Sequence, residues 1–172
     1  HINSSTVCLE KSPEMRQLAM KANNIVIGID TSAYTTSIAA ADRTGQILYD
    51  VRQLLQVPIG KRGLRQSEAR AQHHSNLEQL CEELEATIDL NEVGAIAVSN
   101  RPRPVEGSYM PVFLDGVEFG AKLANRLHVP LYYFSHQEGH IEAVRYYSPM
   151  RQVERFLCFH LSGGTSELLL VD

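Results

Sequence analysis

The chain has 172 residues, of which 44% are hydrophobic and 21% charged, a composition that fits one globular domain or one domain and the beginning of another. Its formal net charge of −4 gives no overall basic footprint for nucleic acid. No apolar run approaches the roughly 18 residues that span a bilayer, so no membrane partner is expected. The three cysteines share no metal-ligand spacing, and we interpret them as reduced thiols of a cytoplasmic protein.

Residues 1–24 are expected to lie outside the folded domain, as an N-terminal extension or a foreign tail. The first five residues are mostly polar and no apolar signal segment follows them. Met20 opens a polar stretch that leads directly into the first predicted strand, so it is our candidate for the natural start. The alternative is a short native helix over residues 12–21.

Hydrophobic periodicity after this segment predicts three strands and then alternating helices and strands. The expected strands are 25–29, 37–41, 47–55, 95–99 and 131–134, with the first three antiparallel. The expected helices are a long one capped by Ser67, with Leu77, Leu80, Cys81, Leu84 and Ile88 on one face, then 116–127 and 136–147. The order βββαβαβα is that of the ribonuclease-H-like unit of actin-like (ASKHA) ATPases, so we predict an α/β fold with a mixed five-stranded sheet.

The end of the chain predicts one further hairpin, with strands at 156–161 and 166–171 around a glycine-containing turn. We expect this hairpin to open a second domain of the same kind. The predicted domains are therefore 25–155, a first complete unit, and 156–172, the beginning of the second.

Two histidines, His136 and His140, form the most informative local pattern. Side chains four residues apart lie on one face of a helix, so both rings can reach one cation, and imidazole suits Zn or Fe. Glu138 lies about 200° around the helix from the metal side, so the H-E-x-x-H peptidase mechanism is not predicted. The pair alone also fits an ordinary polar helix start, since a metal site needs three protein donors. His160, in an apolar run, is expected to be a packed core residue.

Two turns have the chemistry of phosphate-binding loops. The first is rich in hydroxyl groups and carries Asp30, Thr31, Ser32 and Thr36, where Asp30 could hold a hydrated Mg²⁺. The second carries Ser162, Gly163 and Gly164, where absent side chains let the backbone approach a phosphate. Either turn alone fits an ordinary hairpin connection. As a pair, each opening a similar unit, they indicate a nucleotide clamped between two halves.

Two basic loops, at 61–66 and 101–109, follow predicted strands. Arginines on such loops suit the recognition of phosphate or carboxylate groups. A solvated surface loop explains either stretch equally well.

Together these residues resemble the TsaD/Gcp family of actin-like proteins, also classed as M22 glycoproteases. The resemblance covers residues 25–172, the first half of a full-length member. It is carried by the strand and E/D-T-S turn ending at Ser32, by H-x-E-G-H at residues 136–140, and by S-G-G at residues 162–164. The segment G-x-x-L-A-x-x-L-x-x-P is matched by Gly120, Leu123, Ala124, Leu127 and Pro130.

The resemblance implies transfer of a threonylcarbamoyl group from threonylcarbamoyl-adenylate to N6 of adenosine 37 in tRNA. It also implies that His136 and His140 bind a catalytic Zn or Fe ion, with a further aspartate ligand from the C-terminal half of the family. The two turns would line a cleft for ATP or the adenylate. The implied partners are a nucleotide, tRNA, and a TsaB-like paralogue or a second copy in a homodimer.

Several positions depart from the family pattern. The cysteine and two acidic residues after E-T-S are replaced by Ala33, Tyr34 and Thr35, and S-G-G-H-T-Q ends here in Thr165-Ser166-Glu167. The G-P-G-L loop is replaced by residues 101–109. These departures indicate a divergent paralogue with a shifted substrate or a lost transferase activity, and we expect this chain alone to be inactive.

Two alternatives stand beside the transferase. A non-catalytic, TsaB-like partner has the same fold but lacks the H-x-E-G-H histidines, which this chain keeps. An M22-type O-sialoglycoprotein metalloendopeptidase is disfavoured by the position of Glu138.

Overall fold

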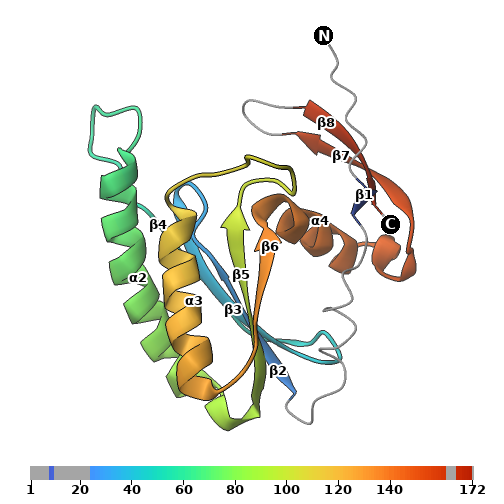
Figure 1. The fold of residues 1–172 in the computed structure, drawn as a ribbon, viewed down its shortest axis with the longest axis horizontal. Helices are drawn as coiled ribbons and strands as arrows, with labels where there is room; N and C mark the ends of the chain where they lie inside the picture. The colour runs from blue at the N-terminus through green and yellow to red at the C-terminus, as the bar shows by residue number, and fades with distance from the viewer. Residues whose placement is uncertain (1–7, 10–23, 162–165, 172) are drawn as a thin grey trace.

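A five-stranded mixed sheet forms the centre of the fold (Figure 1). The computed structural model describes residues 8–9, 24–161 and 166–171. The strands are β2 (Ile25–Asp30), β3 (Thr35–Asp42), β4 (Ile47–Leu54), β5 (Val93–Arg101) and β6 (Leu131–Ser135). They lie in the order β4-β3-β2-β5-β6, with the first three antiparallel and β5 and β6 parallel to β2. The predicted ribonuclease-H-like α/β class is confirmed.

Among the residues that the structure describes, three α-helices accompany this sheet. Helices α2 (Gln66–Thr87) and α3 (Phe113–Leu127) lie together on one side, whereas α4 (His136–Tyr146) leaves the end of β6 on the other (Figure 1). The short 3-10 helices η2 (Leu90–Glu92) and η3 (Pro149–Gln152) complete the connections.

Two predicted helix starts were wrong. Arg65, not Ser67, is the N-cap of α2, because the Glu68 carboxylate accepts a hydrogen bond from the Arg65 N–H at 3.0 Å. Helix α3 begins at Phe113, three residues before the predicted start, because Phe113 is buried and fills a small apolar cluster with Leu55 and Ala69.

The main core lies between the sheet and the helices α2 and α3. Alternate residues of β2 and β3 point into it, as expected for strands with one buried face. They meet the predicted apolar face of α2, where Leu77, Leu80 and Leu84 are almost fully buried. Burial raises the pKa of the Cys81 thiol to about 11, so this cysteine is an unreactive core residue.

Helix α3 approaches β5 closely because it carries Gly120 at the contact. A Cβ atom at this position would lie 2.4 Å from Cγ1 of Val98 and 3.5 Å from Cδ1 of Leu131. Packing therefore explains the glycine of the family segment that contains Gly120, because only a residue without a side chain lets α3 lie this close to the sheet.

The C-terminal end of α4 is fixed to the turn between β3 and β4. The Tyr146 hydroxyl donates a hydrogen bond to the Gly45 carbonyl, and Arg151 donates to the Thr44 carbonyl at 3.0 Å. The Arg151 guanidinium also lies 4.4 Å from the centre of the Tyr146 ring. Gly45 has a φ of +87°, which favours glycine at this turn.

A second, three-stranded sheet contains the predicted hairpin. Its strands β7 (Phe156–Leu161) and β8 (Ser166–Val171) are antiparallel, and β1 (Cys8–Leu9) pairs in parallel with β8. Leu169 and Val171 pack on Ile141 of α4, which joins the two sheets. Cys8–Leu9 therefore belongs to this sheet, whereas residues 1–7 and 10–23 lie outside the described residues.

The interpretation of His160 as a packed core residue was wrong. Its side chain is 20% exposed, and its Nδ1 lies 3.1 Å from Nε2 of Gln137 on α4. The residue shares a face of β7 with Phe156 and Cys158, but at its place near the end of the strand it meets the polar Gln137 of α4 and not the apolar cluster around Ile141.

Within the described part of the chain, none of the helices combines the length and the apolar character of a membrane span.

Candidate metal centre

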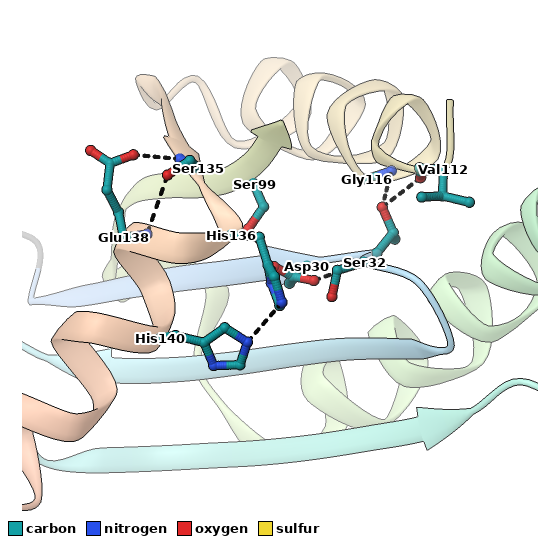
Figure 2. A network of polar contacts seen from close by, with 10 residues as sticks. Asp30, Ser32, Ser99, Val112, Gly116, Ser135, His136, Glu138 and His140 are labelled. Carbon is teal, nitrogen blue, oxygen red and sulfur yellow. Dashed lines mark hydrogen bonds and ion pairs between the residues drawn. The ribbon is translucent and has the colours of Figure 1, made fainter. Parts of the chain in front are cut away.

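The start of α4 is fixed by a reciprocal cap between Ser135 and Glu138. The Ser135 hydroxyl accepts a hydrogen bond from the Glu138 N–H at 3.2 Å, and the Glu138 carboxylate accepts one from the Ser135 N–H at 2.6 Å (Figure 2). The cap places His136 in the first helical turn and His140 one turn later. Because its carboxylate is held at the cap, Glu138 points away from the histidines, as the sequence predicted.

The two histidine rings converge through their Nε2 atoms, which lie 2.8 Å apart (Figure 2). The ring centres are 4.2 Å apart and the planes are nearly perpendicular, at 73°. Two nitrogens bound to one tetrahedral ion, with bonds of about 2.0–2.1 Å, would be about 3.3–3.4 Å apart. The two Nε2 atoms are closer than this, at the distance of a hydrogen bond between the rings, but they converge on one place, as two ligands of one ion must.

Asp30 lies behind His136, at the end of β2. Its Oδ2 is 2.8 Å from Nδ1 of His136 and 2.5 Å from the Ser99 hydroxyl, and its Oδ1 accepts the Ser32 N–H at 2.7 Å. Burial opposes ionisation of this carboxyl, but the hydrogen bond and charge of His136, with the bonds from Ser32 and Ser99, lower the pKa of Asp30 to about 2. Asp30 is thus a carboxylate held against an imidazole.

Burial and the neighbouring His136 and His160 lower the pKa of His140, while the charge of Asp30 opposes them. The shift favours the neutral imidazole, which is the form that binds a metal ion.

The side chains of Thr31 and Thr36, both predicted to contact a nucleotide, are fully buried. The Thr31 hydroxyl donates to the Val112 carbonyl at 2.8 Å and accepts the Gly116 N–H at 3.3 Å, so it anchors the start of α3. The Thr36 hydroxyl is bonded to His73 and Asn76 of α2. These hydroxyl groups have no surface to offer a ligand, which leaves Asp30 and Ser32 as the reachable members of the first turn.

Ser162, Gly163 and Gly164 lie outside the described residues, so their nucleotide role stays a prediction. The hairpin that they connect reaches the site through Glu167. Its carboxylate accepts hydrogen bonds from Arg103 at 2.8 Å and from Gln137 at 2.7 Å. Burial alone would raise the pKa of Glu167, but the bonds from Gln137 and Arg103 lower it. Residues of the predicted basic loop, of α4 and of the hairpin therefore meet in one polar cluster.

Sequence reasoning missed Ser99 and Gln137. Ser99 lies near the carboxyl end of β5, and Gln137 follows β6 at the start of α4. Site residues gather at such places in α/β folds, so the position of each residue after a predicted strand was the available signal. Within residues 24–161 and 166–171, no group of three or more His, Cys, Asp or Glu side chains is arranged to hold a metal ion. The described part of the chain thus offers two donors to the predicted metal ion, His136 and His140, and a complete site needs at least one more donor.

Comparison with known proteins shows the family of the chain. The sequence profile of the TsaD family, tRNA N6-adenosine threonylcarbamoyltransferase, matches residues 52–172. A probable mitochondrial enzyme of that name from Drosophila melanogaster is 33% identical over 154 residues, covering 86% of this chain and 36% of the relative. The enzyme of that name from Neorickettsia sennetsu is 29% identical over 148 residues, covering 86% of this chain and 42% of the relative. The chain thus spans less than half the length of these relatives.

Solved structures agree on the fold alone. YeaZ from Pseudomonas aeruginosa superposes with a TM-score of 0.51 at 19% sequence identity, over 84% of this chain and 64% of YeaZ. The profile match over residues 52–172 includes the histidine pair of α4, and on that ground the chain belongs to the TsaD family of tRNA N6-adenosine threonylcarbamoyltransferases.

Proposed function

We propose that this chain supplies the histidine ligands of a tRNA N6-adenosine threonylcarbamoyltransferase, which transfers threonylcarbamoyl from its adenylate to adenosine 37. The observation that carries the proposal is the pair of Nε2 atoms of His136 and His140, 2.8 Å apart, with Asp30 bonded behind the first ring. A Zn or Fe ion bound there would supply a Lewis acid for the carbonyl under attack. The chain's own part is to hold two neutral imidazoles in a fixed orientation.

We place the nucleotide, ATP or the adenylate, beside Ser32 and Asp30 and against the turn at residues 162–164. Asp30 and Ser32 stand at the carboxyl end of β2, next to the histidines. An adenylate bound there would lie beside His136 and His140, the residues that would hold the ion. We expect a further metal donor and the remaining walls of the cleft to come from the part of full-length family members that this chain does not cover.

The test is a transferase assay with the complete gene product, loaded with Zn or Fe, with threonylcarbamoyl-adenylate and a tRNA that carries adenosine 37. We expect the modified nucleoside to appear by mass spectrometry of digested tRNA. The variant with both His136→Ala and His140→Ala should give none. A metal-loaded protein that yields no modified nucleoside would contradict the transferase and favour the non-catalytic partner. Cleavage of a sialoglycoprotein in place of tRNA modification would favour the peptidase.

The hairpin sheet carries an apolar face that predicts self-association of this chain. Leu157, Phe159, Leu161 and Leu168 are 49% to 69% exposed on β7 and β8. The edge of β8 is paired at Leu170 and Val171, where β1 lies beside it, so this edge is not what would hold two copies together there. The apolar face remains, and such faces favour association with a second copy.

We therefore expect a homodimer at a concentration of about tens of micromolar by light scattering. Replacing Phe159 and Leu168 by lysine should give a monomer, whereas Val144→Lys, an equivalent change at an exposed position of α4, should leave the dimer intact. A monomeric unmodified chain would refute the prediction. In the complete protein, a TsaB-like paralogue is the proposed alternative partner for the first domain.

A cytoplasmic location is part of the proposal. Relatives from Drosophila melanogaster and Homo sapiens are named mitochondrial, so fractionation of cells that express the complete protein decides between the two compartments.

A further inference from the structure

We propose that Asp30 is a positioning residue for His136: it holds the proton on Nδ1 and turns the Nε2 lone pair toward His140. This role differs from the Mg²⁺ contact predicted for Asp30 from the sequence, and it leaves the nucleotide beside Ser32 and Asp30 as proposed above. The consequence for metal binding rests on the function proposed above, because the orientation of Nε2 matters only if that atom binds an ion.

The chemistry of the contact fixes the proton. The ionised carboxylate of Asp30 only accepts hydrogen bonds, so at 2.8 Å the Nδ1 of His136 must donate. In a neutral imidazole the other nitrogen then carries the lone pair. That nitrogen is Nε2, the atom that faces His140 at 2.8 Å. A ring turned over by 180° would aim a carbon atom at His140 and would lose the bond to Asp30.

Asp30 is itself held on both oxygens. It follows Ile29, which pairs with Val98 across the parallel strands β2 and β5, so Ser99 lies beside it in the sheet. The Ser99 hydroxyl and the Ser32 N–H then bond to different oxygens of the carboxylate, at 2.5 Å and 2.7 Å. The Asp30 side chain is only 22% exposed. A carboxylate held by a serine hydroxyl and a backbone N–H restrains the His136 ring more tightly than a solvated carboxylate would.

The same geometry argues against Asp30 as a direct ligand. Asp30 contacts the Nδ1 side of the His136 ring, whereas the two histidines converge on the Nε2 side (Figure 2). The imidazole ring stands between the carboxylate and the place where an ion would bind. Carboxylates in this position behind a metal-binding histidine set its tautomer and orientation, and their loss typically weakens metal binding about 10- to 100-fold.

The first measurement is the tautomer of His136 in the metal-free chain, from ¹⁵N NMR of the histidine rings at about pH 9, where free imidazole is neutral. We expect the proton of His136 on Nδ1 in the unmodified chain. Asp30→Ala should shift the proton toward Nε2, because the acceptor at Nδ1 is gone. Asp30→Asn keeps a carbonyl acceptor and should show a smaller shift. Ser99→Ala, which removes one bond to Asp30 and leaves the carboxylate in place, serves if Asp30→Ala fails to fold.

The second measurement is the affinity of the complete gene product for Zn²⁺, by competition with a chromophoric chelator. Asp30→Ala should weaken binding about 10- to 100-fold, with Asp30→Asn between it and the unmodified protein. The control is Asp50→Asn, the same change at an exposed carboxylate that pairs with Arg52 on the same strand. It should leave the affinity unchanged.

The outcomes separate the two proposals. A His136 proton on Nε2 in the unmodified chain, or equal Zn²⁺ affinities of the unmodified, Asp30→Ala and Asp30→Asn proteins, overturns the positioning role. An unmodified protein that binds no Zn²⁺ overturns the proposed function, while the NMR comparison still decides whether Asp30 positions the ring.

Discussion

Loss of the bound metal is the expected result of replacing His136 and His140 together by alanine. The complete gene product should carry about one Zn or Fe ion per chain by elemental analysis, and the double variant should carry none. Removing both imidazoles leaves no converging nitrogen donors on α4, and the described part of the chain contains no other cluster to replace them. The 172-residue chain alone should bind the ion weakly or not at all, because at least one donor is missing.

The matched control is His74→Ala. His74 is an exposed histidine on α2 whose Nε2 lies 3.5 Å from the Glu78 carboxylate four residues later. The His74→Ala substitution removes one imidazole from the surface without changing α4, so the metal content should be unchanged. Circular dichroism should show that all variants keep their helices, since both site histidines are partly exposed. Unchanged metal content in the double variant would disprove the assignment of these ligands.

Substitution of Gly120 by alanine should destabilise the fold by up to about 2 kcal/mol in its free energy of unfolding. Alanine is the better helix former by about 1 kcal/mol, but overpacking a filled core costs about 1–3 kcal/mol. Here the new Cβ would lie 2.4 Å from Val98 and 3.7 Å from Cδ1 of Ile29. Because Val98 is 1% exposed in the main core, the contact cannot relax by moving into solvent. Gly120→Val should have a larger effect than Gly120→Ala.

Gly139→Ala provides the matched control for this prediction. Gly139 is also inside a helix, α4, but nothing lies within 4 Å of a Cβ atom built there. The same substitution should therefore raise the free energy of unfolding by up to about 1 kcal/mol. Urea denaturation of the two variants and the unmodified chain measures both changes. If Gly120→Ala stabilised the chain as Gly139→Ala does, the close approach of α3 to β5 would be refuted.

Local patterns predicted the strands of the five-stranded sheet and its helices, but not β1. A short β-branched run marked β2, and the spacing of Leu77, Leu80 and Leu84 marked the buried face of α2, because that spacing follows directly from helix geometry. Element ends were less certain. The N-cap of α2 is Arg65, whose backbone N–H donates to the Glu68 carboxylate. The general preference for serine at helix N-caps pointed to Ser67 and did not reveal this contact.

The partners of individual polar side chains could not be predicted in the same way. Thr31 and Thr36 have the residue type of a phosphate-binding turn, yet both hydroxyl groups point into the protein and bond to α2 and α3. The same alternation that places one residue at the surface buries the next, so the register of the strand, and not the residue type, decides which hydroxyl is reachable.

The sequence by itself determined the order of the elements, the α/β class, and the pair of histidines on one face of α4. These features depend on residues a few positions apart, whose relative placement is set by a single helix or strand. Only the tertiary structure decided that Asp30 contacts His136, 106 residues away, that Ser99 holds Asp30 from the neighbouring strand, and that His160 faces α4 instead of the core. Such contacts depend on how β2, β5 and β6 align in the sheet and where α4 leaves it, and that alignment is fixed by the packing of the whole core.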